Sequence, residues 1–592
     1  MNIYFFQCQE DYNNSIYLPY TSGVLWSYVN QFDDIQVNYN LIDIFFEKKD
    51  PLEYIDTLGK IKPDLVLFSN YGWNTRYHMD LAKRIKERFP DVKIIIGGPN
   101  SQIDEDYLEE HFYVDIGTWG EGEGTLLDLL RYYIGQIDNL ESIPGIAYIE
   151  NKKYYKTEKR KRKTELTIPS PYLTGLFDSY FEKYNYNFMP IWETNRGCPY
   201  HCTFCDLGAD YYNKLYDFNL DKLLSEIDWF VDKKIEYVEI ADANFGILPR
   251  DIEIVKYIKQ KHVDTGYPKK INATWAKNSP DRVFDMSKIL ESINRGGVTL
   301  ALQSLNKTAL DNIKRFNIVN HRLEETIKKY QEYDIQTYHD FILGLPGETL
   351  DSWKEGLLYT IDINPNGWIF GHPLEAYKNT EFSDPQYITK HKLQFVQTPQ
   401  VTFFSKRNKN IEIEFGNYVI ETFSMTKEQY VEAFLFKWFL ILVHSLGWAH
   451  YTASNCGEKR RFFYIKLYDW MRNNNCVLKN EYVITKNSLL NTINNGNFWG
   501  RQMFGEDDIY WEYESASCII LEQNRQIFYN DLKEFCKSYY PQLDDNTIDL
   551  NDNQVISFSR KYKSKPKYDS FQDFCIEIYW YGRRRKAWLV NE

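Results

Sequence analysis

The 592-residue sequence lacks long hydrophobic runs, and its nine cysteines are few and mostly scattered. The most apolar stretch, residues 433–446, contains Lys437 and is shorter than the ~20 residues that span a bilayer, so we expect a core helix and no membrane association. The amino terminus lacks the basic start and small-residue cleavage site of a signal peptide. One tight cysteine group fits a metal site in a reducing compartment better than a disulfide framework, and we expect a cytoplasmic protein.

Positive charge is also in deficit, because the formal net charge is -13. This excludes a general attraction to phosphate backbones, so we expect no nucleic-acid partner. Two basic runs, residues 156–163 and 583–586, could contact an acidic partner, but a solvated linker and a solvated tail are the simpler interpretation. Apolar residues make up 43% and aromatic residues 17%, which is ample for packed cores.

The order of apolar and polar segments predicts an α/β protein with three domains. Short apolar strands alternate with helical stretches over residues 1–150, which predicts a Rossmann-like, doubly wound domain. Charged and proline-containing residues over 151–185 predict a linker. Strand and helix alternate again over 186–385, as in a partial (β/α) barrel, and residues 386–592 predict a mainly helical domain.

Three cysteines, Cys198, Cys202 and Cys205, stand at spacings of four and three in one loop after the first expected barrel strand. Thiolates suit iron-sulfur clusters or zinc. Three of them can hold three corners of a cube-shaped cluster and leave one iron without a protein ligand. Zinc would require a fourth ligand, for which His201 is the nearest candidate.

This C-x-x-x-C-x-x-C pattern, with the aromatic Phe204 before the last cysteine, resembles the hallmark of the radical S-adenosylmethionine (SAM) superfamily. The resemblance implies a [4Fe-4S] cluster whose open iron binds SAM, and one-electron cleavage of SAM to a 5'-deoxyadenosyl radical. It also implies an external electron donor of the flavodoxin or ferredoxin type.

Three later segments resemble SAM-contacting parts of that family. Residues 239–246 resemble the second-strand region near the SAM amino group, which makes Asp242 a candidate contact. Residues 301–310 place Gln303 and Ser304 where the family has an acidic residue and a serine. Residues 339–349 resemble the strand and turn beside the adenine, with Leu343 as the candidate.

The first 150 residues resemble the cobalamin-binding module of one large radical SAM subclass. The resemblance rests on SNYGWN (69–74), IIGGPN (95–100) and GEGEGT (120–125), whose glycines let backbone approach a large ligand. No Asp-x-His-x-x-Gly segment occurs, so we expect no histidine ligand to cobalt, and Trp73 is the candidate beneath the corrin ring. The alternative is a similar domain without cofactor. The candidate cobalamin contacts are Ser69, Asn70, Tyr71, Trp73, Asn74, Gly97, Gly98, Pro99, Gly120, Glu121, Gly122 and Glu123.

These features together predict a cobalamin-dependent radical SAM methyltransferase acting on an unactivated carbon of a peptide or another natural-product intermediate. A radical rearrangement, cyclisation or epimerisation without methyl transfer is an alternative, and so is a cofactor-bound regulatory protein without turnover. A tRNA methylthiotransferase is set aside, since only Cys8 precedes Cys198 and that class needs three further amino-terminal cysteines.

Overall fold

The computed structural model describes residues 1–555 except 13, 163–164, 209, 278, 295–296, 318–319, 404–406 and 504–508. The chain divides into two units. The first contains residues 1–274, 377–380 and 408–415, and the second contains 275–376, 381–407 and the described part of 416–592. The basic run 583–586 lies outside the described residues.

A seven-stranded sheet in the order β3-β1-β4-β5-β6-β7-β8 forms the amino-terminal part of the first unit. Its first five strands pair in parallel, and β7 and β8 are added antiparallel. The strands are β1 (Asn2–Gln9), β3 (Asn40–Glu47), β4 (Leu65–Ser69), β5 (Lys93–Gly97), β6 (Ile116–Thr118), β7 (Ile146–Glu150) and β8 (Lys153–Lys156).

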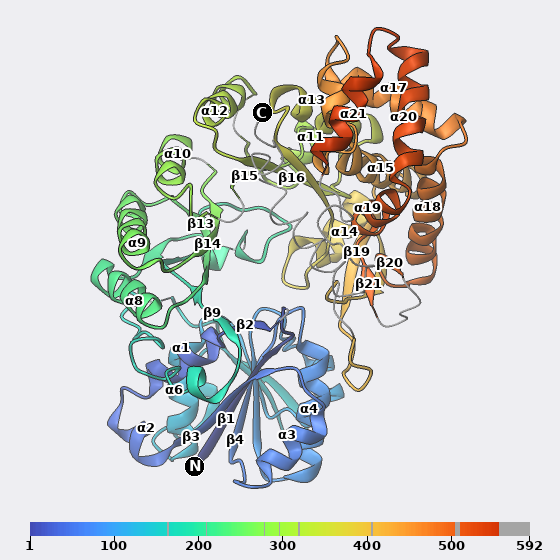
Figure 1. Cartoon of the computed structure of the whole chain (residues 1–592). Helices are drawn as coiled ribbons and strands as arrows, with labels where there is room; N and C mark the ends of the chain where they lie inside the picture. The colour runs from blue at the N-terminus through green and yellow to red at the C-terminus, as the bar shows by residue number, and fades with distance from the viewer. Residues whose placement is uncertain are drawn as a thin grey trace. The chain divides into compact units, whose positions relative to one another are not determined.

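Helices cover both faces of this sheet, with α1 and α6 on one side and α3 and α4 on the other (Figure 1). Burial on both faces explains why residues 3–6 of β1 and 65–68 of β4 are consecutive apolar side chains rather than alternating ones. The order of the parallel strands reverses between β1 and β4, and in open α/β sheets ligands bind at the carboxyl ends of the strands beside such a point. The helices are α1 (Tyr20–Val29), α2 (Asp33–Asn38), α3 (Pro51–Leu58), α4 (Thr75–Arg88), α5 (Glu105–Glu110) and α6 (Gly122–Tyr133), with a 3-10 turn over Leu140–Ser142.

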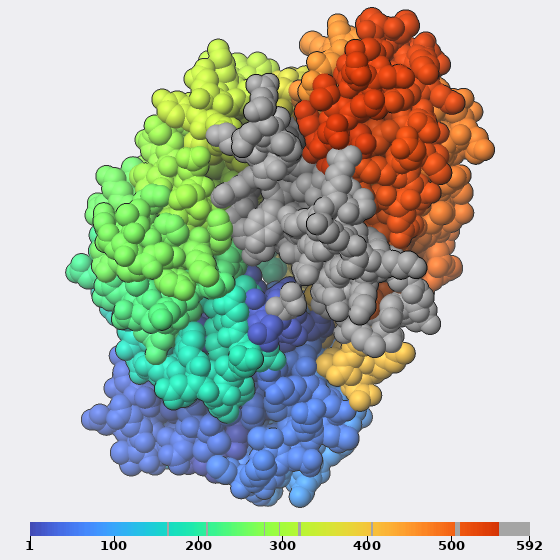
Figure 2. Space-filling model, in the orientation of Figure 1, coloured from blue at the N-terminus to red at the C-terminus, as the bar shows by residue number. Residues whose placement is uncertain are grey.

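The segment expected to be a linker contains one short helix, α7 (Tyr180–Lys183), and packs against the rest of its unit. Tyr172 and Phe177 are fully buried in it. It leads into β9 (Asn187–Met189), which pairs in parallel with β2 (Ser15–Tyr17) near the amino terminus. Figure 2 shows this part of the chain, in teal, lying directly on the blue surface of the amino-terminal residues.

Six strands of the predicted partial barrel form two three-stranded sheets, one in each unit. The first has the order β10-β13-β14, and β10 pairs with β13 in parallel. The second, β15-β16-β17, is parallel throughout. Helices follow the strands as in βα units, which confirms the predicted class. The first-unit elements are β10 (Ile191–Trp192), α8 (Leu220–Asp232), β13 (Tyr237–Phe245), α9 (Asp251–Thr265) and β14 (Lys270–Trp275), with a small antiparallel pair β11 (Asn195–Arg196) and β12 (Tyr216–Asp217) and 3-10 turns over Asp206–Gly208 and Asp210–Tyr212. The second-unit elements are α10 (Pro280–Ile289), β15 (Val298–Gln303), α11 (Lys307–Asn312), α12 (Asn320–Glu332), β16 (Thr337–Leu343), α13 (Leu350–Ile363) and β17 (Trp368–Pro373).

The rest of the second unit is mainly helical, as predicted. The apolar stretch 433–446 begins within α15 and continues through a π-helical turn, and its side chains are buried. No helix among the described residues has both the length and the apolar character needed to cross a bilayer. The elements are α14 (Pro385–His391), β18 (Gln394–Pro399), β19 (Phe415–Glu421), α15 (Lys427–Leu440), α16 (His450–Ser454), α17 (Arg460–Asn473), α18 (Val477–Asn495), β20 (Arg501–Gln502), β21 (Tyr510–Trp511), α19 (Tyr513–Gln523), α20 (Arg525–Tyr539) and α21 (Asp545–Gln554), together with a 3-10 turn over Glu381–Ser383 and the π-helical turn Ile441–Ser445.

Lys437, the one charge in that apolar stretch, forms an ion pair inside the helical core. Its ammonium contacts the carboxylate of Glu514, and the two residues are 5% and 6% exposed. The ammonium also lies 4.1 Å from the ring centre of Phe434. Each charge therefore compensates the burial of the other.

We expect Glu514→Gln to destabilise the protein by about 3–5 kcal/mol, because it leaves the Lys437 ammonium buried without a counter-charge. The measurement is the urea midpoint of the transition followed by far-UV circular dichroism. The double variant Lys437→Met/Glu514→Leu removes both charges and should recover most of the loss. Equal destabilisation of the single and double variants would contradict this account.

Candidate active site

The three cysteines lie in a loop that backbone hydrogen bonds hold in shape. Cys198 N–H donates to Tyr212 O at 2.8 Å, and Cys205 N–H donates to Cys202 O at 3.1 Å. Cys198 and Cys202 are buried and Cys205 is half-buried. Burial raises the pKa of Cys205, and the neighbouring thiols of Cys202 and Cys198 raise it further, so the three sulfurs are electrostatic neighbours.

Within the described residues, no group of three His, Cys, Asp or Glu side chains converges on a single metal ion. His201 is exposed. A zinc site needs four ligands around one ion, whereas a cubane cluster takes each thiolate on a different iron and so holds the sulfurs further apart. Three thiolates in one loop suit three corners of such a cluster.

Strand β13 supplies two side chains that position this loop. Asn244 Nδ2 donates to Cys198 Sγ at 3.2 Å. Asp242 accepts from Thr194 N–H at 2.8 Å and from Asn195 Nδ2 at 2.7 Å, so it fixes the strand that enters the loop. Burial raises the pKa of Asp242 to about 7, although these hydrogen bonds act in the opposite direction.

Three acceptor atoms beside the loop are buried without a hydrogen-bond partner among the described residues: Asn195 Oδ1, Asp206 Oδ1 and Asn244 Oδ1. Buried polar atoms are nearly always satisfied, and leaving one unpaired costs free energy. A ligand with a positively charged amino group, such as SAM, would satisfy acceptors of this kind. The three thiols therefore suit a cluster, and the three unpaired acceptor oxygens suit the amino group of SAM.

The GEGEGT segment joins the cysteine loop through ion pairs. Arg196 contacts Glu123 at 2.6 Å and Glu193 at 3.0 Å, and Arg162 contacts Glu121 at 2.9 Å. These carboxylates raise the pKa of Arg196 well above its usual value, despite the opposing effect of burial. The side chains of the two predicted contacts Glu121 and Glu123 are thus engaged with protein, so a ligand there would meet the backbone beside Gly120 and Gly122.

The loop after β4 lies at the point where the strand order reverses. Asn70 N–H donates to Gly97 O at 2.7 Å, which brings the 69–74 and 97–100 segments together. Gly98 has a φ of +100°, and a Cβ there would lie 2.4 Å from Asn70 O. Tight packing between the two loops therefore demands this glycine, whatever ligand is bound.

An aromatic pair stands on this loop. Tyr71 and Trp73 stack with ring centres 4.6 Å apart, and Trp73 is 52% exposed. A large exposed apolar side chain at a strand-order reversal suits a flat ligand such as a corrin. Ser69 and Asn74 are buried beside it and hold the backbone, as when Tyr71 N–H donates to Asn74 Oδ1 at 2.7 Å.

His78 was not predicted as a functional residue, and it is fully buried beside the same loop. Its Nε2 accepts from Cys8 N–H at 3.1 Å, and its Nδ1 lies 2.9 Å from Asn70 Oδ1. Burial lowers the pKa of His78 well below its usual value, so the ring is neutral. Because both ring nitrogens are occupied, His78 positions Asn70.

Gln303 and Ser304 lie at the end of β15 in the second unit. Gln303 has a φ of +64°, the left-handed region that non-glycine residues rarely adopt. Ser304 Oγ donates to Glu348, whose pKa burial raises, and Asn306 N–H donates to Ser304 Oγ at 2.9 Å. Glu348 was not predicted from the sequence.

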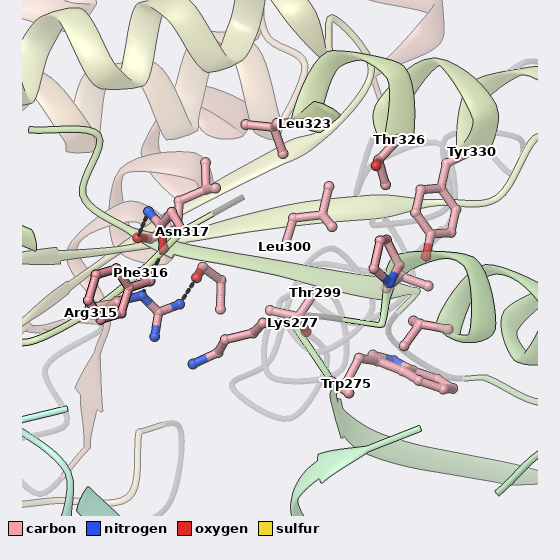
Figure 3. A pocket seen from close by; sticks show the side chains of 16 residues that line it. Trp275, Lys277, Thr299, Leu300, Arg315, Phe316, Asn317, Leu323, Thr326 and Tyr330 are labelled. Atoms are coloured by element: carbon pink, nitrogen blue, oxygen red, sulfur yellow. Dashed lines mark hydrogen bonds between the residues drawn. The ribbon is translucent and has the colours of Figure 1, made fainter. Parts of the chain in front are cut away.

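Two further residues hold the strand end where Gln303 departs from regular geometry. Asn317 Nδ2 donates to Leu302 O at 2.7 Å and to Ser304 O at 2.9 Å, and Arg315 binds Ala301 O (Figure 3). They line a cavity of about 40 Å³ with Trp275, Thr326 and Tyr330, among others. That volume holds a few waters and no cofactor, so the cavity belongs to the support of β15.

Three other predicted contacts are Phe204, Leu343 and Pro99. Phe204 is half-buried between two of the cysteines. Leu343 is buried at the end of β16, and Pro99 O accepts from Asn379 within the first unit. Contact of each predicted residue with a cofactor stays a prediction.

Gly208 gives a test of the loop geometry. A Cβ at this position would lie 2.2 Å from Cys202 O, so Gly208→Ala must displace the backbone beside a thiol. We expect a several-fold loss of iron and sulfide after anaerobic reconstitution, measured by colorimetric analysis. Gly356→Ala is the matched control, because its Cβ would make only an ordinary 3.5 Å contact with Phe341. Full iron content in Gly208→Ala would show that the loop has another shape.

Comparison with known proteins assigns both parts of this site. Residues 192–358 match the family model of the Radical SAM superfamily, and residues 28–130 match that of the B12 binding domain. The cobalamin-dependent radical SAM methyltransferase TokK of Streptomyces tokunonensis is 32% identical over 467 residues, which are 78% of this chain and 68% of TokK. The 2-(S-pantetheinyl)-carbapenam-3-carboxylate methyltransferase of Streptantibioticus cattleyicolor is 30% identical over 465 residues, 76% of this chain and 67% of that protein.

The fold agrees with these matches. The solved structure of the cobalamin-dependent S-adenosylmethionine radical enzyme OxsB, with aqua-cobalamin and S-adenosylmethionine bound, superposes with a TM-score of 0.59, covering 100% of this chain and 84% of OxsB at 15% identity. The predicted cofactors are confirmed as those of the family: a [4Fe-4S] cluster, SAM and cobalamin. The chain belongs to the radical SAM superfamily and, within it, to the cobalamin-dependent radical SAM methyltransferases.

Proposed function

We propose that this methyltransferase adds a methyl group to an unactivated carbon of a small natural-product intermediate. The observation that carries the proposal is one network in which the cysteine loop and the GEGEGT loop are held together by Arg196 and Glu123. One relative supports the substrate class, since it is named as the methyltransferase of a carbapenam that carries a pantetheinyl group. A peptide substrate is the less supported choice.

Each cofactor has a set of residues in this proposal. Cys198, Cys202 and Cys205 hold the cluster. Asn195 and Asn244 of the first unit would contact SAM, and the loops after β4, β5 and β6, with Trp73, would hold cobalamin. When bound, these groups supply one-electron cleavage of SAM, hydrogen abstraction and the transferred methyl group.

The protein's own part is positioning and exclusion of water. Asp242 fixes Thr194 and Asn195 at the entrance to the loop. Trp73 and Tyr71 would present an apolar surface to bound cobalamin, while the ring nitrogens of His78 are engaged with Cys8 and Asn70.

The electron that the reaction consumes comes, we propose, from an external low-potential carrier. Its reduced form loses one electron and the cluster gains it. No bond of the carrier is made or broken.

The substrate proposal is tested with trideuteriomethyl-SAM, the reconstituted enzyme, titanium(III) citrate and 2-(S-pantetheinyl)-carbapenam-3-carboxylate. We expect the product mass to rise by one trideuteriomethyl group in place of hydrogen, with 5'-deoxyadenosine formed. Cys198→Ala/Cys202→Ala/Cys205→Ala should form neither product, whereas Cys476→Ala, a buried cysteine of the second unit, should form both.

Two outcomes would contradict the proposal. Deoxyadenosine without a mass gain would favour a radical rearrangement or epimerisation. Label transfer that persists in the triple cysteine variant would exclude radical chemistry at this loop.

A further inference from the structure

A basic cleft of about 310 Å³ opens beside the cysteine loop in the first unit. Its cationic lining comes from two stretches of the chain, Lys159–Arg162 of the expected linker and Lys214 just after the cysteines. Tyr211, Asn213 and Tyr216 complete the wall, and among the described residues no carboxylate belongs to the lining. We call this set of residues the basic cleft.

Two of its five cations are neutralised by neighbouring carboxylates. Arg160 contacts Asp128, and Arg162 contacts Glu121 at 2.9 Å. Within the described part of the chain, Lys159, Lys161 and Lys214 form no ion pair. These three ammonium groups are therefore free to meet charge from outside.

Lys159 shows that the positive charge is concentrated. Its ammonium lies 4.0 Å from the ring centre of Tyr211 and 5.2 Å from that of Trp119, and burial together with Lys156 lowers its pKa. An incoming anion would relieve the repulsion between these lysines. The cleft thus has a charge that the chain itself leaves uncompensated, in a protein of net charge -13.

The cleft lies one backbone layer from the cluster loop. Tyr212 O accepts from Cys198 N–H at 2.8 Å, and Lys214 O lies 2.2 Å from where a Cβ on Gly197 would stand. Arg162 Nη1 donates to the same Lys214 O at 2.8 Å. A protein bound at the cleft would therefore be separated from the cluster ligand Cys198 by the backbone of residues 212–214.

We propose that the basic cleft is the docking surface of an acidic one-electron carrier protein of the flavodoxin type. This inference rests on the proposed function, which requires one electron from outside for each SAM cleaved. In the docked complex the reduced carrier is oxidised by one electron and the cluster is reduced by one.

A carrier fits better than the other anions that such a cleft attracts. A long nucleic acid would extend beyond the cleft, where the overall negative charge of the protein would repel its phosphates. The tyrosine rings that could stack with bases already contact cations, as when Arg162 lies 4.6 Å from the ring centre of Tyr216. A small acidic protein can place its carboxylates at the cleft without extending far over the rest of the negatively charged surface.

The test reverses the three unpaired charges in the reconstituted full-length enzyme. Lys159→Glu/Lys161→Glu/Lys214→Glu should weaken binding of oxidised flavodoxin roughly 10- to 100-fold at low salt, by calorimetry, since three surface ion pairs are lost. Wild-type affinity should itself fall as salt rises. Reduction of the cluster by flavodoxin hydroquinone, followed by visible absorbance, should slow to a similar extent.

Lys60→Glu/Lys83→Glu/Lys152→Glu is the matched control. These lysines are exposed in the same unit, form no ion pair among the described residues, and give the same change in net charge. It should bind flavodoxin and accept its electron much as wild type does. With titanium(III) citrate in place of flavodoxin, all three proteins should transfer label equally.

The outcomes separate the two proposals. Equal flavodoxin affinity in the two triple variants, no binding by wild type, or binding of bulk tRNA that the cleft variant loses would each overturn the docking proposal. Absence of labelled product with titanium(III) citrate in wild type would instead count against the proposed function and leave the binding result valid.

Discussion

The mostly buried guanidinium of Arg196 is the interaction on which the arrangement of the first unit depends. It lies two residues before the first cluster cysteine and is held by Glu193, between β10 and β11, and by Glu123 at the start of α6. Removing one partner of such a pair leaves a costly unpaired charge, so the loop and the helix must stay together. Around it, Tyr20 donates to Glu193, and Arg162 binds both Glu121 and Arg196 O.

This dependence explains why so many side chains near the site do not face a ligand. Asp242 and His78 both use their polar groups for hydrogen bonds to backbone or to another side chain. They fix the ends of strands, where chemistry in α/β proteins is placed. The atoms left unpaired, such as Asn195 Oδ1 and Asn244 Oδ1, are then the ones available to a bound molecule.

Much of the fold and the cysteine site could be predicted because their signals are local. Alternating apolar strands and helices give the two α/β parts, and the spacing of Cys198, Cys202 and Cys205 is contained in eight residues. Asn244, Glu348 and His78 could not be predicted, because their roles arise from partners 46, 44 and 70 residues away along the chain. Nor does the sequence reveal that Gly98 serves loop packing, since a close approach to protein and one to a ligand demand the same residue.

The ion pairs of Glu121 and Glu123 have a consequence for how such enzymes can be recombined. Each acidic residue lies in the cobalamin-binding part of the sequence, while Arg162 and Arg196 lie in the linker and at the start of the barrel. A chimera that exchanges the first 150 residues for those of another protein would separate acids from bases that have adapted to each other. A chimera boundary near residue 150 therefore separates the partners of both ion pairs, and a functional chimera would have to include both arginines.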